Sequence, residues 1–285
     1  MVGPYSRGMG WQRDLKDGRD YHPHHAAVHT LLQRLGPSRR PRRLPGVTDL
    51  REYFPAAVDQ GSLNASTAFA VAALVGYFEA CSTGHVLDAS ALFLYQVALK
   101  TLGLNGNASV NFRTTLKSLV RFGMPPESYW PYEASRFEST PADPFLFSYG
   151  RDYETIHYFR LDASNGETTL RNVKAYLAAG FAVAFGFPVP SSLTTDADIA
   201  FRPDFDSIRG GQAVLAAGYD DDRRIASDTG ALLFRCSWGS RWGEHGYGWL
   251  PYRYVIHQAA VDFWTVVRRE WIKAGVLSRP ILNAD

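Results

Sequence analysis

A long apolar stretch constrains the fold of this chain more than any other feature. Residues 67–80 are almost entirely apolar, and their first charged side chain is Glu79. The apolar side chains fall on every side of a helix, so we expect this helix to be buried rather than to cover a surface. It is much shorter than the roughly 20 residues that cross a bilayer. The sequence therefore predicts a helix at the centre of a globular core.

The residues that precede this helix predict a site for negative charge. Ser66 lies at the expected first turn, where its side chain can cap free backbone N–H groups. The same position suits a nucleophile, because the free amides and the helix dipole stabilise developing negative charge. Gln60 lies upstream and can present a side-chain N–H to the same point.

Several ordered motifs resemble those of papain-like (C1 family) cysteine proteases, and especially of their bacterial branch. Residues 211–219 resemble the strand that carries the family histidine, and residues 237–248 resemble its Ser-Trp-Gly motif and the Gly-rich loop that follows. Residues 44–51 resemble the start of the mature fold, and residues 130–132 resemble the crossover between its lobes. The resemblance extends over roughly residues 10–270. The family's active-site segment is matched by Gln60, Gly61, Leu63, Thr67 and Ala68.

Three positions of this resemblance hold different side chains. Papain-type catalysis uses a thiolate, an imidazole and an amide, whereas the corresponding residues here are Ser66, Gln212 and Cys236. A serine needs a base to become nucleophilic, and an amide such as Gln212 takes up no proton at neutral pH. Gln60 and Trp238 are retained, but both also suit structural roles. We therefore expect a pseudoprotease that is not an enzyme and has no intact catalytic residue.

The resemblance implies an α+β fold, the two-lobe papain-like cysteine protease fold. We expect a basic N-terminal arm or leader over residues 1–46, a helical lobe over 47–150, a β-rich lobe over 151–272 and a C-terminal tail over 273–285. Hydrophobic periodicity and turn residues predict the elements within these lobes. The expected helices are 28–35, 67–80, 89–102, 112–122 and 168–179, and the expected strands are 153–161, 181–189, 211–219, 231–238 and 262–268.

Charge is distributed unevenly along the chain. The formal net charge is +2, but residues 1–46 contribute +6 and the remaining residues contribute −4. Such a balance predicts neither nucleic acid nor a membrane as a partner. The two cysteines, Cys81 and Cys236, lie far apart in sequence, and residues 1–20 contain no apolar leader. Both features favour a reducing, cytoplasmic location.

No metal ion and no cofactor is expected. Four histidines fall between His22 and His29, but no cysteine or carboxylate accompanies them there, so a solvated arm is favoured over a metal site. His157 and His245 are the candidates for a base that would serve Ser66, but a lone histidine is more often structural or exposed. Cys236 is also more typical of a packed apolar residue than of a nucleophile.

The groove between the lobes is expected to bind a peptide or a partner protein. Different side chains are expected to reshape this groove. Asn64 and Ser109 correspond to glycines of the family, and Ala65 corresponds to a serine. Two other functions stay open: a divergent serine-dependent hydrolase or acyl-transfer enzyme that uses Ser66, and a structural subunit of a complex. The sequence leaves the oligomeric state open. The expected binding residues are Asn64, Ala65, Ser109, Gln212 and Trp238.

Overall fold

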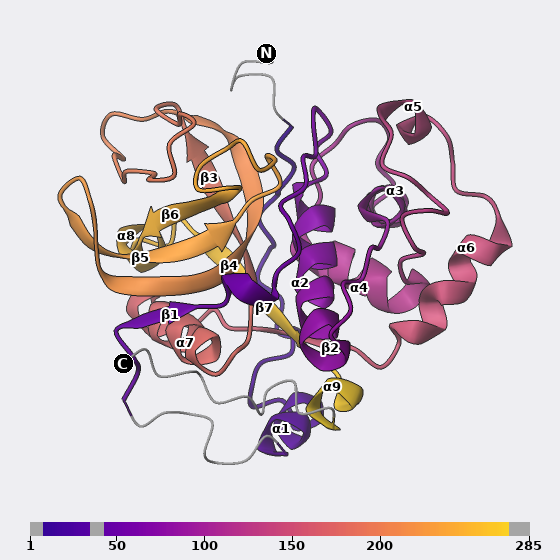
Figure 1. The fold of residues 1–285 in the computed structure, drawn as a ribbon, viewed down its shortest axis with the longest axis horizontal. Helices are drawn as coiled ribbons and strands as arrows, with labels where there is room; N and C mark the ends of the chain where they lie inside the picture. Colours follow the sequence, from indigo (N-terminus) through magenta and orange to yellow (C-terminus); the bar gives the residue numbers. More distant parts are fainter. Residues whose placement is uncertain (1–7, 35–42, 274–285) are drawn as a thin grey trace.

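The chain folds into a helical region beside an antiparallel sheet (Figure 1). The structure, a computed structural model, describes residues 8–34 and 43–273. Its helices are α1 (Ala26–Gln33), α2 (Ser66–Thr83), α3 (Ala91–Thr101), α4 (Phe112–Phe122), α5 (Ala134–Phe137), α6 (Pro144–Ser148), α7 (Gly166–Ala178), α8 (Tyr252–Ile256) and α9 (Arg269–Lys273). Its strands are β1 (Val47–Asp49), β2 (His157–Arg160), β3 (Val183–Pro190), β4 (Ile208–Ile225), β5 (Asp228–Arg235), β6 (Tyr247–Pro251) and β7 (Val261–Val267).

The sheet is organised around the long strand β4. The strand order is β2-β7-β3-β4-β5-β6, and β1 also pairs with β4. Every pairing is antiparallel. Because β1 pairs with β4, residues 47–49 belong to the sheet. They precede α2 in the chain and fall within the span 47–150 that was expected to form the helical lobe. The boundaries expected for the two lobes and for the terminal segments stay predictions.

Helix α2 lies where the helical region meets the sheet, as Figure 1 shows. All its residues from Ser66 to Val71 are buried, and it ends at Gly84, whose φ of 75° is the left-handed conformation that favours glycine. The prediction of a buried central helix is confirmed, with two differences. Ala72 is only half-buried. Ser66 is the first helical residue and caps no N–H group of α2; Ala65 holds the N-cap position.

The ends of the other helices follow local capping chemistry. Helix α4 spans the predicted residues 112–122, and Gly123 ends it with a φ of 72°. Helix α3 begins later than predicted, because Ser90 rather than an earlier residue accepts a hydrogen bond from the Phe93 N–H group.

The strands differ from the prediction mainly at their ends, and β3 and β5 span 183–190 and 228–235 rather than 181–189 and 231–238. Strand β2 is shorter than the expected 153–161, because a 3-10 turn precedes Tyr153 and the Tyr153 hydroxyl donates to the Met124 carbonyl in the helical region. Strand β4 continues past residue 219 and is irregular where it pairs with β5. Strand β6 begins inside the Gly-rich stretch 239–248 that suggested only a loop.

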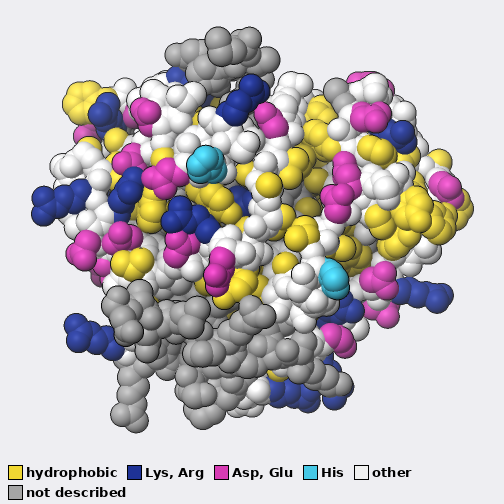
Figure 2. Space-filling model, viewed as in Figure 1, with side chains coloured by type: hydrophobic (Ala, Val, Ile, Leu, Met, Phe, Trp, Pro, Cys, Tyr) yellow, Lys and Arg dark blue, Asp and Glu magenta, His cyan; other side chains and the backbone are white. Residues whose placement is uncertain are grey.

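The visible surface is mixed in charge. Figure 2 shows acidic and basic side chains interspersed over this face, with apolar side chains between them. Among the helices within residues 8–34 and 43–273, none is long and apolar enough to cross a membrane.

Candidate functional site

An extended N-terminal segment, residues 8–12, runs between the helical region and the sheet (Figure 1). On the sheet side, the N–H groups of Gly10 and Trp11 both donate to the Gly211 carbonyl of β4, at 3.1 and 2.9 Å. On the helical side, the Val110 N–H donates to the Gly10 carbonyl at 3.0 Å. The segment is therefore hydrogen-bonded both to the sheet and to the helical region.

The carbonyl oxygen of Met9 lies at the start of α2. It accepts a hydrogen bond from the Ser66 N–H at 3.1 Å and another from Gln60 Nε2 at 2.8 Å. The Ser66 N–H is free for this contact because the first N–H groups of a helix have no partner within the helix. These are the two donors that the sequence analysis placed at a site for negative charge, and the structure brings them to one carbonyl oxygen.

Glycines, which have no side chain, allow this segment to pack closely against its neighbours. A Cβ atom on Gly186 would lie 2.0 Å from the Trp11 indole, and one on Gly211 would lie 2.4 Å from the Trp11 carbonyl oxygen. A Cβ atom on Gly10, whose φ is 121°, would lie 2.1 Å from the Asn64 carbonyl oxygen. Any larger residue at these positions would displace the segment or its wall.

Ser66 is fully buried beneath the segment. Its Oγ accepts a hydrogen bond from the Ala213 N–H of β4 at 3.1 Å. The helix that supplies the carbonyl-binding N–H is thereby fixed to the strand that carries the next candidate residue, Gln212.

Gln212 and Cys236 lie beside each other next to Gln60. The Gln212 Nε2 atom is 3.0 Å from Gln60 Oε1, 3.3 Å from Ser237 Oγ and 3.5 Å from Cys236 Sγ. The Ser237 hydroxyl also donates to Gln60 Oε1 at 2.5 Å. Within the described residues, Gln212 Oε1 is buried without a hydrogen-bond partner. Gln212 therefore lies between Gln60 and Cys236, whereas Ser66 and Gln60 meet at the Met9 carbonyl oxygen.

The other expected binding residues lie along the segment, with different roles. Asn64 Oδ1 accepts a hydrogen bond from the Met9 N–H at 3.1 Å, and Trp238 Nε1 donates to the Gly8 carbonyl at 3.4 Å. Ala65 is buried at the N-cap of α2. Ser109 is half-buried. The backbone hydrogen bond to the segment comes from the next residue, Val110, whose N–H donates to the Gly10 carbonyl.

The histidines considered as bases or ligands lie elsewhere. His245 is exposed, and His157 Nδ1 is 3.1 Å from the Thr155 carbonyl oxygen. The four histidines between residues 22 and 29 are exposed, and one of them, His25, stacks on Tyr21. In the described ranges, no group of three or more His, Cys, Asp or Glu side chains is placed to hold a metal ion.

Asp262, near the start of β7, anchors the segment, and sequence reasoning missed it. Its Oδ2 accepts hydrogen bonds from the Trp11 indole at 3.1 Å and from the Asp14 N–H at 2.8 Å. Its Oδ1 pairs with the Arg160 guanidinium. No local motif marks this residue, because its partners lie between 102 and 251 residues away in the sequence.

The charges around this anchor are unequal. Four carboxylates surround two guanidinium groups: Asp14, Asp20, Asp162 and Asp262 with Arg113 and Arg160. Burial, and next the nearby charge of Asp14, raise the pKa of Asp262 to about 7. Burial also raises the pKa of Asp14 above its ordinary value. A proton held by this pair near neutral pH reduces the repulsion between the two buried carboxylates.

Comparison with known proteins supports the fold and its family. No family model matches the chain. The structure of xylellain, a cysteine protease from Xylella fastidiosa, is 28% identical with a TM-score of 0.71, over 92% of this chain and 97% of that chain. An uncharacterized peptidase C1-like protein of Acanthamoeba polyphaga mimivirus is 27% identical over 92% of this chain and 87% of its own length. The structure of digestive procathepsin L 3 from Tenebrio molitor larval midgut has a TM-score of 0.61 at 16% identity, over 92% of this chain and 76% of that chain.

These relatives contradict the prediction that the chain is not an enzyme. Xylellain is a cysteine protease and the viral relative is peptidase C1-like, so both point to an enzyme. The prediction rested on three side chains, whereas each of these likenesses extends over 92% of the chain. The chain has the papain-like cysteine protease fold, and these relatives support its place in the papain-like C1 cysteine protease family.

Proposed function

We propose that the groove between the helical region and the sheet binds an extended polypeptide, the first step that a peptidase performs. One observation carries the proposal: the Met9 carbonyl accepts hydrogen bonds from the Ser66 N–H and Gln60 Nε2, inside a segment bonded to both walls. Backbone hydrogen bonds of this kind bind a chain largely independently of its side chains. Residues 8–12 occupy the same place and must leave before another chain binds.

The segment belongs to the same chain as the groove, and this tether determines how strongly it competes with a free peptide. A tethered segment acts at an effective concentration on the order of millimolar. A free peptide at micromolar concentration is therefore excluded from the groove of the native chain. Releasing the segment without altering the groove should expose the binding activity.

The substitution Gly10→Ala is expected to release the segment. The added Cβ would lie 2.1 Å from the Asn64 carbonyl oxygen at a φ of 121°. A synthetic peptide with the sequence of residues 6–15 should then bind this variant on the order of 100-fold more tightly than it binds the native chain. Isothermal titration calorimetry measures the affinity, and amide exchange of Trp11 reports release of the segment.

Two controls make this test specific. Gly18→Ala is the same chemical change at a position with open space around it, so its peptide affinity should equal that of the native chain. A peptide with alanine at the Gly10 position should bind neither variant. Equal binding of the parent peptide to both variants, or binding to neither, would refute the proposal.

Acyl transfer at Ser66 is a second candidate function. It is favoured by the same two donors, because they lie where the oxygen of an attacked carbonyl would take up negative charge. Ser66 Oγ would add to the carbonyl carbon, its hydroxyl proton would pass to the amide nitrogen, and the C–N bond would break to release the amine. A fluorophosphonate probe should then label Ser66 in the Gly10→Ala variant well above the level in Gly10→Ala with Ser66→Ala. Equal labelling of the two proteins would exclude this candidate.

A further inference from the structure

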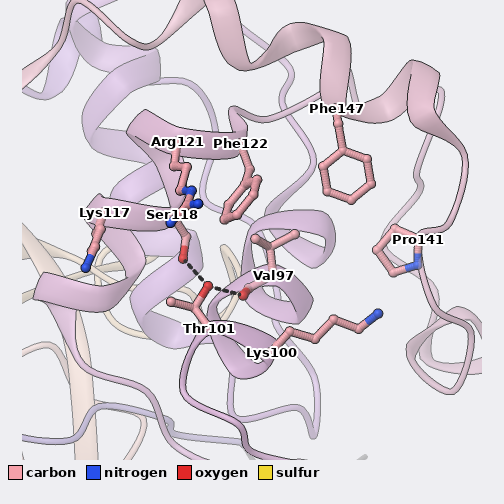
Figure 3. Close-up of a pocket in the computed structure, with 9 residues that line it drawn as sticks. All are labelled: Val97, Lys100, Thr101, Lys117, Ser118, Arg121, Phe122, Pro141 and Phe147. Atoms are coloured by element: carbon pink, nitrogen blue, oxygen red, sulfur yellow. Dashed lines mark hydrogen bonds between the residues drawn. The ribbon is translucent and has the colours of Figure 1, made fainter.

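A separate cavity lies within the helical region, between α3, α4 and the segment that leads into α6 (Figure 3). Its volume is about 550 Å³, which is within the usual range for small-molecule sites. It shares no lining residue with the groove described above. It is lined by Val97, Lys100, Thr101, Lys117, Ser118, Arg121, Phe122, Pro141 and Phe147.

The ionisable groups of this cavity are all positive. Lys100, Lys117 and Arg121 line it, and no acidic residue of the ranges 8–34 and 43–273 does. All three are exposed, and none forms an ion pair with another residue of the described ranges. Residues 47–285 carry a net charge of −4, so these three cations are opposite in sign to the net charge of this part of the chain. A concave surface of one charge sign raises the local concentration of opposite ions.

One side of the cavity is apolar. The rings of Phe122 and Phe147 contact each other edge to face, with centroids 6.1 Å apart, and Pro141 lies on the same side (Figure 3). The Arg121 guanidinium carbon is 5.4 Å from the Phe122 ring centroid. A positive charge therefore lies next to the apolar wall. This arrangement suits a ligand that has both an anionic group and an apolar body.

The hydroxyl groups on the other side of the cavity limit what can bind. The Thr101 hydroxyl donates to the Val97 carbonyl at 2.8 Å, so Ser118 Oγ, 3.2 Å away, donates to Thr101. Both hydroxyl protons are thus used within the protein. An anion must therefore be held by exposed cationic side chains rather than by the hydroxyl groups, and an apolar body by the rings.

Helix capping does not account for this arrangement. Lys100 and Arg121 lie in the last turns of α3 and α4, where the helix dipole favours cations. That effect explains each residue on its own helix, but it explains neither Lys117 in the middle of α4 nor the aromatic wall. We propose that this cavity binds a small organic anion with an apolar body, such as an aromatic or aliphatic sulfonate or carboxylate.

A fluorescence titration with 8-anilinonaphthalene-1-sulfonate tests the proposal on the full chain. The variant with Lys100→Gln, Lys117→Gln and Arg121→Gln should bind this probe at least tenfold more weakly than the native protein does. The matched control replaces three exposed arginines outside the cavity and has the same net charge: Arg151→Gln, Arg171→Gln and Arg224→Gln. Its affinity should stay within twofold of the native value. The cavity positions are exposed, so circular dichroism should show both variants folded.

A neutral probe with the same ring system, N-phenyl-1-naphthylamine, separates the charge from the apolar body. It should bind the native protein more weakly than the sulfonate does and should not distinguish the two variants. Unchanged sulfonate affinity in the cavity variant would overturn the proposal. So would an equal loss in the control variant, which would indicate general electrostatics, or native binding of the neutral probe as tight as that of the sulfonate.

Discussion

The substitution Ala68→Glu is expected to destabilise the fold by more than about 3 kcal/mol, which is enough to unfold a marginally stable domain. Ala68 has no exposed surface and lies in the first turn of α2, where the helix meets β4. A carboxylate placed there would lose its hydration, and the apolar core offers it no cation. Urea unfolding followed by tryptophan fluorescence measures the change, with circular dichroism at low urea to detect outright unfolding.

Ala72→Glu is the matched control for this prediction. Ala72 lies on the same helix but is half-buried, so its glutamate can reach solvent. We expect its cost to be about 1 kcal/mol or less. Equal costs at the two positions would show that α2 has no dry face at Ala68. An unchanged urea midpoint for Ala68→Glu would contradict the burial that the structure assigns to the helix.

The core of the fold was predictable because it follows from periodicity and from glycine. The apolar residues after Ser66 predict a buried helix, and Gly123 ends the helix predicted over residues 112–122 through a backbone conformation that other residues rarely adopt. The buried helix itself continues past the predicted residue 80 and ends at Gly84. The exposure of Ala72 was not predictable. A helix that is apolar all round gives no signal for the one side on which neighbouring elements leave a gap.

The resemblance indicated an arm or leader over residues 1–46, but local sequence did not predict that residues 8–12 lie between the helical region and the sheet. Residues 8–12 have neither helical nor strand periodicity, and they are bound mainly through backbone groups. A backbone carbonyl such as that of Met9 carries no sequence signal. The anchor Asp262 lies 248 residues from Asp14, whose N–H it accepts, so only the folded sheet reveals the pair.

The candidate site shows what a motif comparison can and cannot supply. Order and spacing along the chain indicated that Ser66, Gln212 and Cys236 belong to one site, and the structure places Gln212 and Cys236 beside Gln60, with Ser66 bonded to the residue after Gln212. The same comparison led to the wrong prediction that the chain is not an enzyme. The side chains at positions 66, 212 and 236 show which chemical groups are present. They do not by themselves determine the function of the groove around them.

Rebuilding the papain-type groups at these positions should create a reactive thiolate. The variant carries Ser66→Cys, Gln212→His and Cys236→Asn in the Gly10→Ala background, so that the segment no longer covers the site. The N-terminus of α2 and a neighbouring imidazolium both favour the thiolate. An ordinary thiol with a pKa near 8.5 is roughly 0.3% ionised at pH 6. We therefore expect iodoacetamide to alkylate residue 66 on the order of 100-fold faster at pH 6 than it does in the Ser66→Cys variant of the same background.

Cys81 provides an internal reference for this measurement. It is half-buried in α2, near the end opposite to Ser66, and its alkylation rate should be the same in both proteins. Peptide mapping by mass spectrometry separates residue 66 from Cys81 and, in the Ser66→Cys variant, from Cys236. If residue 66 in the rebuilt variant titrates near 8.5, as an isolated thiol does, then the side chain at position 212 does not face it when the groove is open. The assignment of the three positions to one catalytic site would then be wrong. The fold and the peptide-binding proposal would be unaffected, because the fold rests on the core and the sheet and the proposal rests on the Ser66 N–H and Gln60 contacts with the segment.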